Sequence, residues 1–518
     1  MSIIKRILAI VLVAATVFSL SACGKKEDDG ADNAGNSVAA DPNENRVLNV
    51  AAMQDSGTLD PVKVTGGFLS VLPTYMEPLF YDKITGERDW MLATAIEKVT
   101  DTQYTMRLRE GVKFSNGNPF TADDVIFTFK IYSEEPSRAL NVQSLDLAAT
   151  AKIDDYTVDL RYTVFNAAQE IMLNAVMILD AESYDPEKMS ATPVGTGPYK
   201  VAEYVVNSHL TVERRDDYWG DPSAIKTIHF KVMNESAQVV NGLEAGALDM
   251  AGVNGFDIEH VESLGKYSIV QSKPGYALAV FYNMAPGSPL ESREARRALD
   301  HAINTESIIN LAYGGYAEKT RWPLSEALVD FEERSANLDG TYSVGFDIER
   351  AKALAQQAGL VGKTLRVITN GADVFSSMAE IMQSDFKEIG VDLKILNYDQ
   401  ASYYSLISDP SQFEIALYAT SAPTQMAADI LYAYFLFFTL GWEGPERDAY
   451  MEEGAKVLAI ADEKTRNDAL HELVRKFVDL SPWYGVLDTL SIFAYNKDLK
   501  GVDTSYIGGA ASYVNLSW

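Results

Sequence analysis

The sequence predicts an α/β protein of two or three domains, and three observations support this. The chain has 518 residues, about three or four times the usual domain size. Hydrophobic residues make up 47% and charged residues 23% of the chain, which is typical of globular proteins. In the second half, strand-like and helix-like segments alternate, which indicates a mainly parallel sheet covered by helices.

The alternation is clearest between residues 278 and 418. Asp347 is a predicted N-cap, and Gly359 stands where a glycine commonly ends a helix. A single long helix is expected at 449–479 and a strand at 490–495. We expect strands at 278–283, 365–369, 391–397 and 413–418, and helices at 292–303, 306–313, 348–358, 374–389 and 401–408.

The first half of the chain reads as a mixture of strands, hairpins and helices. Thr121 and Asp124 form a capping-box pattern at the start of a helix with apolar residues at helical spacing. Further strands are expected at 46–53, 104–109, 157–164, 199–204, 209–214 and 225–233, and further helices at 66–79, 167–178 and 236–248.

The N-terminus has the pattern of a targeting segment. Lys5 and Arg6 precede an apolar run at 7–20, which is shorter than the roughly 20 residues that a transmembrane helix needs. Leu20–Ser21–Ala22–Cys23 resembles the bacterial lipobox, in which the cysteine is diacylated. We therefore expect a lipoprotein signal peptide at 1–22 and a lipidation site at Cys23. A plain signal peptide with a chance cysteine is the alternative.

Residues 23–46 are expected to form a lipid-anchored disordered tether, because they contain almost no residue that could be buried. Two acyl chains suffice for stable anchoring. The protein is thus expected on the extracytoplasmic face of the cell membrane. A tethered enzyme would have the same N-terminus, so the tether predicts a location but not a function.

Charge and cysteine content exclude several classes of function. The net charge is -29, which argues against binding nucleic acid or an anionic membrane through a general basic face. The single cysteine excludes a disulfide within the chain. It also excludes a zinc site built from two or more thiolates.

Motifs for catalysis, metals and cofactors are missing from the sequence. Gly362–Lys363–Thr364 resembles the end of a phosphate loop, but Gln357 replaces the first glycine and the segment leads from helix to strand. No nucleophile elbow and no zinc-protease motif occur, and no two of the five histidines lie within four residues of each other. We therefore predict no catalytic residue, no metal and no cofactor, and a protein that is not an enzyme.

A set of segments resembles the bacterial extracellular solute-binding proteins of family 5, the oligopeptide-, dipeptide- and nickel-binding subunits of ABC importers. The most specific segment is 108–125, which is similar to the family signature "LRxGVKFsdGxPxTAxDV". The others follow in family order: Leu59–Asp60–Pro61, Glu77–Pro78–Leu79, 193–199 (PVGTGPY), 215–220 (RDDYWG), 296–303 and 347–360.

The resemblance implies a two-lobed, periplasmic-binding-protein-like (type II) α/β fold with an inserted subdomain and a hinge cleft. Gly195 and Gly197 would serve a tight backbone turn near the hinge. The implied segments are 47–66, 187–272 and 482–518 for lobe one, 67–186 for the inserted subdomain, and 273–481 for lobe two.

One segment departs from the family pattern. Peptide-binding members carry a tryptophan and an aspartate after a strand of lobe two, and this aspartate pairs with the α-amine of the peptide. In this chain the tryptophan position falls on Thr420 and the aspartate position on Pro423, with Ser421 between them. A buried ammonium without a carboxylate is costly. A free peptide amine is therefore expected to bind weakly, unless another acid such as Asp429 replaces the lost one.

The resemblance implies a binding subunit that captures a peptide-like solute in a closing cleft and delivers it to an ABC permease with its ATPase, without nucleic acid and as a monomer. A sugar-like solute, a metal chelate or a ligand-presenting sensor are alternatives, and a surface hydrolase is a remote one. Candidate ligand-binding residues are Tyr418, Thr420, Ser421, Asp429, Trp442, Trp483 and Tyr484; the last two resemble a family cleft strand. Each of the four aromatic candidates could instead lie in the core.

Overall fold

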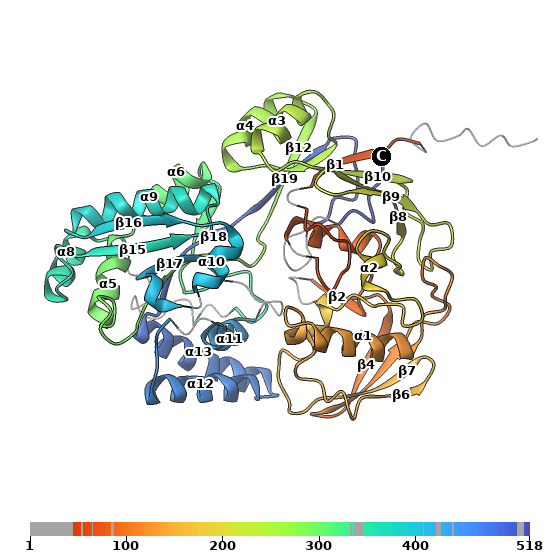
Figure 1. Ribbon diagram of the computed structural model, residues 1–518, viewed down its shortest axis with the longest axis horizontal. Coiled ribbons are helices and arrows are strands. Elements are labelled where there is room, and N and C mark those ends of the chain that lie inside the picture. Colours follow the sequence, from red (N-terminus) through yellow and green to blue (C-terminus); the bar gives the residue numbers. More distant parts are fainter. Residues whose placement is uncertain are drawn as a thin grey trace, which may run out of the picture. The chain divides into compact units, whose positions relative to one another are not determined.

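A computed structural model gives the structure of the chain, and two large sheets organise it (Figure 1). The strand orders are β12-β19-β11-β1-β10-β9-β8 and β14-β18-β13-β17-β15-β16. A four-stranded sheet, β4-β5-β7-β6, and the pair β2-β3 complete the strands. The structure describes residues 45–52, 55–64, 66–83, 87–331, 334, 345–407, 409–420, 426–437, 440–504 and 512–518.

The seven-stranded sheet combines strands from both ends of the chain. β1 is parallel to β10 and β11, and the other pairs are antiparallel. Helices α3 (Ser236–Glu244) and α4 (Ile258–Ser263) cover one face through a small apolar cluster. The strands are β1 (Leu48–Ala52), β8 (Tyr199–Val205), β9 (His209–Arg214), β10 (Thr227–Val232), β11 (Met250–Gly252), β12 (Tyr267–Ser272) and β19 (Ser491–Asn496).

The smaller sheet packs with α1 (Ala122–Glu134) into a core that it shares with the seven-stranded sheet. The predicted capping box is confirmed, because the Thr121 amide donates to Asp124 Oδ2 at 2.7 Å. The elements are β2 (Phe80–Asp82), β3 (Arg88–Trp90), β4 (Ala93–Thr100), β5 (Gln103–Leu108), β6 (Ala151–Asp154), β7 (Thr157–Arg161) and the short α2 (Pro186–Met189).

Two helices expected in this region are wrong. At 66–79 the chain forms only short 3₁₀ segments, Gly66–Ser70 and Leu72–Thr74. At 167–178 only Ile171–Ala175 is helical, again as a 3₁₀ segment. The backbone at the end of this stretch bonds to distant groups, because the Met177 amide donates to the Tyr132 hydroxyl at 3.0 Å. Tertiary partners thus replace the hydrogen bonds of a helix.

The six-stranded sheet is mixed, not mainly parallel as expected. β15 is parallel to β16 and β17, whereas β13 is antiparallel to β17 and β18, and β14 is antiparallel to β18. The antiparallel half contains the strands by which the chain enters and leaves this sheet. The strands are β13 (Ala277–Tyr282), β14 (Ala317–Lys319), β15 (Thr364–Thr369), β16 (Asp392–Asn397), β17 (Ile415–Thr420) and β18 (Trp483–Thr489).

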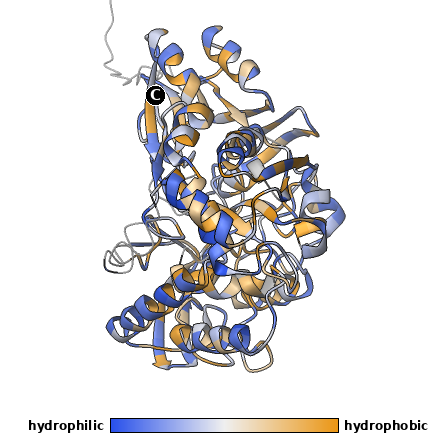
Figure 2. Cartoon of the chain, turned by 90° about the vertical axis from the view of Figure 1, so that its left-hand side faces the viewer, coloured by the Kyte–Doolittle hydropathy of each residue, from blue (hydrophilic) through white to orange (hydrophobic). Residues whose placement is uncertain are grey.

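Helices cover both faces of the six-stranded sheet, because alternate residues of its strands pack to opposite sides. On β13, Leu278, Val280 and Tyr282 face one apolar cluster, while Ala279 and Phe281 face the other. Figure 2 shows hydrophobic and hydrophilic residues side by side along the helices. The first cluster includes α5 (Arg293–Ala302), α6 (Thr305–Tyr313), α8 (Ile348–Gln357) and α9 (Asp373–Glu388), and the second includes α10 (Gln400–Ile407), α11 (Ala427–Phe437), α12 (Pro445–Leu458) and α13 (Glu463–Leu480).

Helix ends follow the local sequence signals where these are strong. Asp347 accepts from the Arg350 amide at 3.0 Å, and Gly359 has φ +68°, so both predicted ends of α8 are confirmed. The single long helix expected at 449–479 is wrong. It is divided into α12 and α13, because Asp462 accepts from the Thr465 amide at 2.9 Å and begins a new helix.

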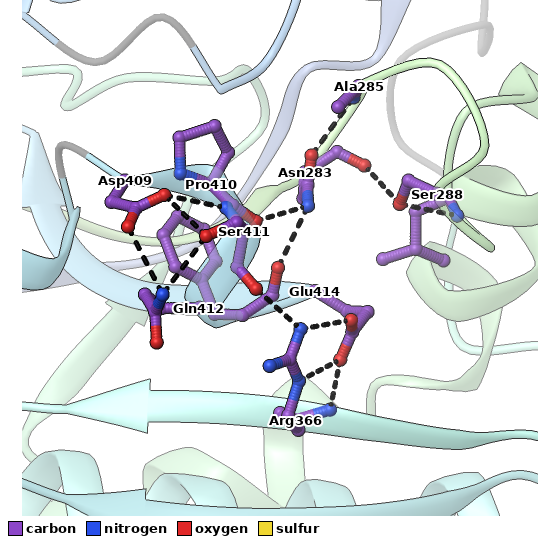
Figure 3. Close-up of polar contacts among 11 residues, drawn as sticks. Asn283, Ala285, Ser288, Arg366, Asp409, Pro410, Ser411, Gln412 and Glu414 are labelled. Atoms are coloured by element: carbon purple, nitrogen blue, oxygen red, sulfur yellow. Dashed lines mark hydrogen bonds and ion pairs between the residues drawn. The ribbon is translucent and has the colours of Figure 1, made fainter.

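A polar cluster holds the start of β17 against its neighbours (Figure 3). Arg366 on β15 donates from Nε and Nη2 to the two carboxylate oxygens of Glu414, at 3.0 and 2.7 Å. Asn283, after β13, donates from Nδ2 to the carbonyls of Pro410 and Phe413, at 2.6 and 2.9 Å. This cluster fixes β13, β15 and β17 in register at one edge of the sheet, opposite the edge where β15 and β17 end.

The chain crosses between the two large sheets in two places. β12 leads to β13 through 273–276, and β18 leads to β19 through Leu490. The crossings lie together, because Thr489 donates from its amide and its hydroxyl to the Tyr276 carbonyl, at 3.0 and 3.1 Å. The segment 482–518 is therefore shared, with β18 in the six-stranded sheet and β19 in the seven-stranded sheet. We refer to β12–β13 and β18–β19 as the crossing ribbon.

Candidate functional site at one edge of the six-stranded sheet

The carboxyl ends of the parallel strands β15, β16 and β17 meet at one edge of the six-stranded sheet. These strands end at Thr369, Asn397 and Thr420, and the Thr369 hydroxyl donates to Asn397 Oδ1 at 2.7 Å. In open α/β sheets, ligands bind beside the carboxyl ends of the strands. This edge, which we call the carboxyl edge, is therefore the candidate site.

The crossing ribbon passes the same edge. Ala277, the first residue of β13, is in register with Thr420 on β17 and with Asp488 on β18. The contact between Tyr276 and Thr489 follows directly beyond this row. A bend in the ribbon would therefore act next to the carboxyl edge, which is the position a hinge needs if it is to open and close a binding cleft.

A group of tyrosines gives the carboxyl edge aromatic surface. Tyr418 on β17 lies 6.3 Å from the Tyr403 ring in a stacked arrangement and 6.2 Å from the Tyr404 ring, edge to face. The Tyr403 hydroxyl donates to the Leu417 carbonyl at 2.6 Å, which fixes α10 against β17. Tyr404 is 44% exposed and Tyr418 is half-buried. Of the predicted site residues, Tyr418 is thus placed well for aromatic contact with a solute.

The two predicted tryptophans lie in the second apolar cluster of the six-stranded sheet. Trp483 is 1% exposed and contacts the rings of Phe281, Phe435 and Phe477, with centroid distances of 5.0, 5.5 and 4.2 Å. Its Nε1 donates to the Pro323 carbonyl at 3.1 Å. Trp442 packs in the same cluster, 5.2 Å from Phe435. Both indole rings have packing roles.

Tyr484 follows Trp483 on the same strand and therefore faces the opposite side of the sheet. It is buried with Val280 and Tyr282 in the first apolar cluster, where the sheet packs against the helical layer of α5, α6, α8 and α9 (the first helical layer). Burial raises the pKa of its hydroxyl. The structure therefore separates Trp483 and Tyr484, which the sequence placed together.

The remaining predicted residues lie between positions 420 and 429, from the end of β17 to the start of α11. Thr420 is fully buried, and its hydroxyl donates to the Ala277 carbonyl at 3.2 Å. Asp429 lies in the first turn of α11 and is 5% exposed. Ser421 and Pro423, like Cys23, lie outside the residues that the structure describes.

Asp488 is an acid at the carboxyl edge that the sequence analysis did not select. It is 2% exposed, and its Oδ2 accepts from the Glu326 amide at 3.0 Å. Burial raises its pKa to about 6, although the Glu326 amide, the Ser325 hydroxyl and the charge of Lys273 favour the ionised form. The sequence feature that could have identified Asp488 is its position as the one acid in the otherwise uncharged segment 483–489.

A bulge in β18 decides which face Asp488 occupies. The register with β13 shifts between Leu278 and Ala279, so Val486 has no partner of its own. Val486 and Leu487 both pack against the first helical layer, although they are adjacent in sequence. The reversed alternation places Asp488 toward the 325–326 segment, on the same face as Trp483.

The family-like motifs of the first half have structural roles. Arg215 is buried and donates to the carbonyls of Gly195, Gly197 and Lys113, at 3.2, 3.1 and 3.0 Å. A side chain at Gly195 would lie 2.0 Å from the Tyr75 carbonyl oxygen, so the backbones approach too closely for any other residue. The motifs at 108–117, 193–199 and 215–220 thus bind one another.

The described residues contain neither a metal-binding cluster nor a membrane-spanning helix. Within these ranges, no group of three His, Cys, Asp or Glu side chains is arranged to hold a metal ion. No helix in the described part of the chain has both the length and the hydropathy required to cross a bilayer.

Comparisons with known proteins agree with this architecture. Residues 90–438 match the sequence model of bacterial extracellular solute-binding proteins, family 5 Middle. The nickel-binding periplasmic protein of Escherichia coli K12 is 27% identical over 383 residues, which are 67% of this chain and 70% of that protein. The dipeptide-binding protein of the same organism is 25% identical over 341 residues, 59% of this chain and 62% of that protein.

The structure of NikA from Brucella suis, solved in complex with Fe(III)-EDTA, is similar to this fold with a TM-score of 0.80 at 20% sequence identity. The match covers 90% of this chain and 99% of NikA. It confirms the predicted fold class, an α/β periplasmic-binding-protein fold of type II.

Proposed function

The chain belongs to the bacterial extracellular solute-binding proteins of family 5, and from this we propose that it captures a solute at the carboxyl edge of its six-stranded sheet and delivers it to an ABC permease. The crossing ribbon carries this proposal. Both connections between the large sheets lie together beside the carboxyl edge, so one bend would open or close a cleft there. Solute binding would favour the closed form.

The solute that we propose is peptide-like, and the protein binds it without changing it. Tyr418 and Tyr404 supply the aromatic surface for such a contact. Two relatives are named for nickel and for dipeptides, so a chelate is the second solute class to test.

Native mass spectrometry of protein purified from its host tests for a bound solute. The compounds found, together with peptides and metal chelates, are then added to solute-free protein in thermal-shift and small-angle scattering measurements. We expect one class to stabilise the folded state, by about 2.7 kcal/mol at a hundred times the dissociation constant. The same compounds should reduce the radius of gyration. Stabilisation without compaction would contradict the hinge. Failure to find any solute that stabilises the protein would contradict the binding function.

We also propose that Cys23 anchors the protein on the extracytoplasmic face of the membrane. Cys23→Ala should move the protein from the membrane fraction to the soluble fraction, because the acylated side chain is lost. Ser2→Ala, outside the lipobox-like segment, is the control and should leave the distribution unchanged. Membrane association that persists in the Cys23 variant would contradict the anchor.

A further inference from the structure

The charges around Asp488 leave one acid without a cation. Lys273 Nζ lies 2.6 Å from Glu318 Oε2, and Arg321 Nε lies 2.7 Å from Glu326 Oε1. Arg321 donates to both oxygens of Glu326, since its Nη2 lies 2.9 Å from Oε2. Asp488 forms no ion pair with any described residue, so these three acids and two cations carry one uncompensated negative charge when all are ionised.

One oxygen of Asp488 also has no hydrogen-bond partner in the described part of the chain. Oδ2 accepts from the Glu326 amide, but Oδ1 is shielded from solvent and makes no hydrogen bond of acceptable geometry within the described ranges. The Ser325 hydroxyl favours the ionised carboxylate, yet it does not satisfy Oδ1. A buried acceptor left in this way costs free energy, so it calls for a specific explanation.

The position of Asp488 connects it with the proposed site. Asp488, Ala277 and Thr420 form one row across β18, β13 and β17 at the carboxyl edge. All three residues of this row are buried. Asp488 lies two residues before Leu490, where the chain crosses to the other sheet, so bending of the ribbon changes the surroundings of its carboxylate.

A cation is the group that would complete this arrangement. Glu318 is the register neighbour of Asp488 on β14, and like charges in opposed positions are unfavourable. A donor with a positive charge would satisfy Oδ1 and offset the excess charge in one step. The described residues include no set of three metal-ligating side chains, which favours an organic cation over a bare metal ion.

We propose that Asp488 binds a positively charged organic group of the solute, with a primary ammonium as the simplest case. This inference rests on the proposed solute-binding function and assigns a solute class to its site. Asp488 would take the part of the carboxylate whose expected position falls on Pro423. It reaches the carboxyl edge from β18 and not from the loop after β17.

The test uses the full-length protein and pairs of probes that differ by one ammonium group. These are di- to pentapeptides with their N-acetylated forms, and alkyl amines with the corresponding alcohols. Calorimetric titration and thermal shift are measured for the wild type, Asp488→Asn and Glu452→Gln. We expect only probes with an ammonium to bind, and Asp488→Asn to weaken them about tenfold to a hundredfold. Glu452→Gln, on the exposed surface of α12, should bind as the wild type does.

The probe pairs test the proposal even if Asp488→Asn fails to fold. The proposal requires that N-acetylation of a peptide, which removes its ammonium group, abolishes binding to the wild-type protein. Neutral or anionic probes that bind as well as their ammonium partners would overturn the role of Asp488 and leave the binding function intact. Full affinity in a folded Asp488→Asn variant would do the same. If no ammonium probe binds, the proposal is wrong; the solutes found by mass spectrometry then decide separately whether the binding function stands.

Discussion

Replacing Glu77 with glutamine should destabilise the protein strongly, because its carboxylate joins two motifs that are far apart in sequence. Glu77 is 1% exposed. Its Oε1 accepts from the Tyr218 hydroxyl at 2.6 Å, and its Oε2 accepts from Trp219 Nε1 at 2.9 Å. Burial raises the pKa of this acid, although both donors favour the ionised form.

The expected loss in the free energy of unfolding follows from these two hydrogen bonds. Glutamine keeps one acceptor oxygen for Trp219 Nε1, and its amide nitrogen can donate to the Tyr218 hydroxyl, which then accepts. Two hydrogen bonds to a charged group, worth about 1.5–3 kcal/mol each, thus become neutral ones worth about 0.5–1.5 kcal/mol each. We expect Glu77→Gln to lower the free energy of unfolding by about 2–3 kcal/mol.

Urea denaturation followed by circular dichroism measures the effect, with Tyr218→Phe and the double variant completing a thermodynamic cycle. The double variant should lose at least about 1 kcal/mol less than the sum of the single losses, because both changes remove the same contact. Glu452→Gln on the exposed surface of α12 is the matched control and should show no resolvable loss. A Glu77→Gln loss as small as that of the control would refute the reasoning.

Two further predictions concern the six-stranded sheet. Trp483→Ala should lower the free energy of unfolding by about 3–5 kcal/mol, because it removes the ring packed against Phe281, Phe435 and Phe477; a loss below about 1 kcal/mol in urea denaturation would contradict its place in the core. Burial raises the pKa of Asp300 from 3.8 to about 6. Between pH 4 and 6 the folded state therefore keeps a proton that the unfolded state loses. The contribution of Asp300 to the free energy of unfolding should fall as pH rises, by at most about 1.4 kcal/mol per pH unit. This pH dependence should be absent from Asp300→Asn, and equal slopes for variant and wild type would contradict it.

Local chain signals determined much of the secondary structure from the sequence. These signals are the capping box of Thr121 and Asp124, the Asp347 cap and the Gly359 helix end. In each case the contacting residues lie within one or two helical turns of each other in the sequence, so the local sequence predicts the contact. The helix expected at 167–178 failed for the opposite reason. Its amides find partners such as the Tyr132 hydroxyl, which belongs to another helix.

The sequence also determined the family, through motifs whose physical meaning the tertiary structure supplies. The segment 193–199 suggested a tight turn at Gly195 and Gly197. The structure shows that Arg215 binds their carbonyls and that Tyr75 leaves no space for a side chain at Gly195. These partners lie up to 120 positions apart along the chain, and spacing in a sequence carries no information on such contacts.

The tertiary structure alone decided which residues lie at the carboxyl edge. The resemblance made both Trp483 and Tyr484 candidates for a cleft or the core, and strand alternation sends them to opposite faces of the sheet. The sequence did not select Asp488, because its position depends on a bulge in β18 and on burial beneath the 325–326 segment. Local pattern predicted an α/β protein, and the resemblance of its motifs to family 5 identified it as a solute-binding protein. The charge and packing of its site depend on pairings between distant strands, which only the folded chain brings together.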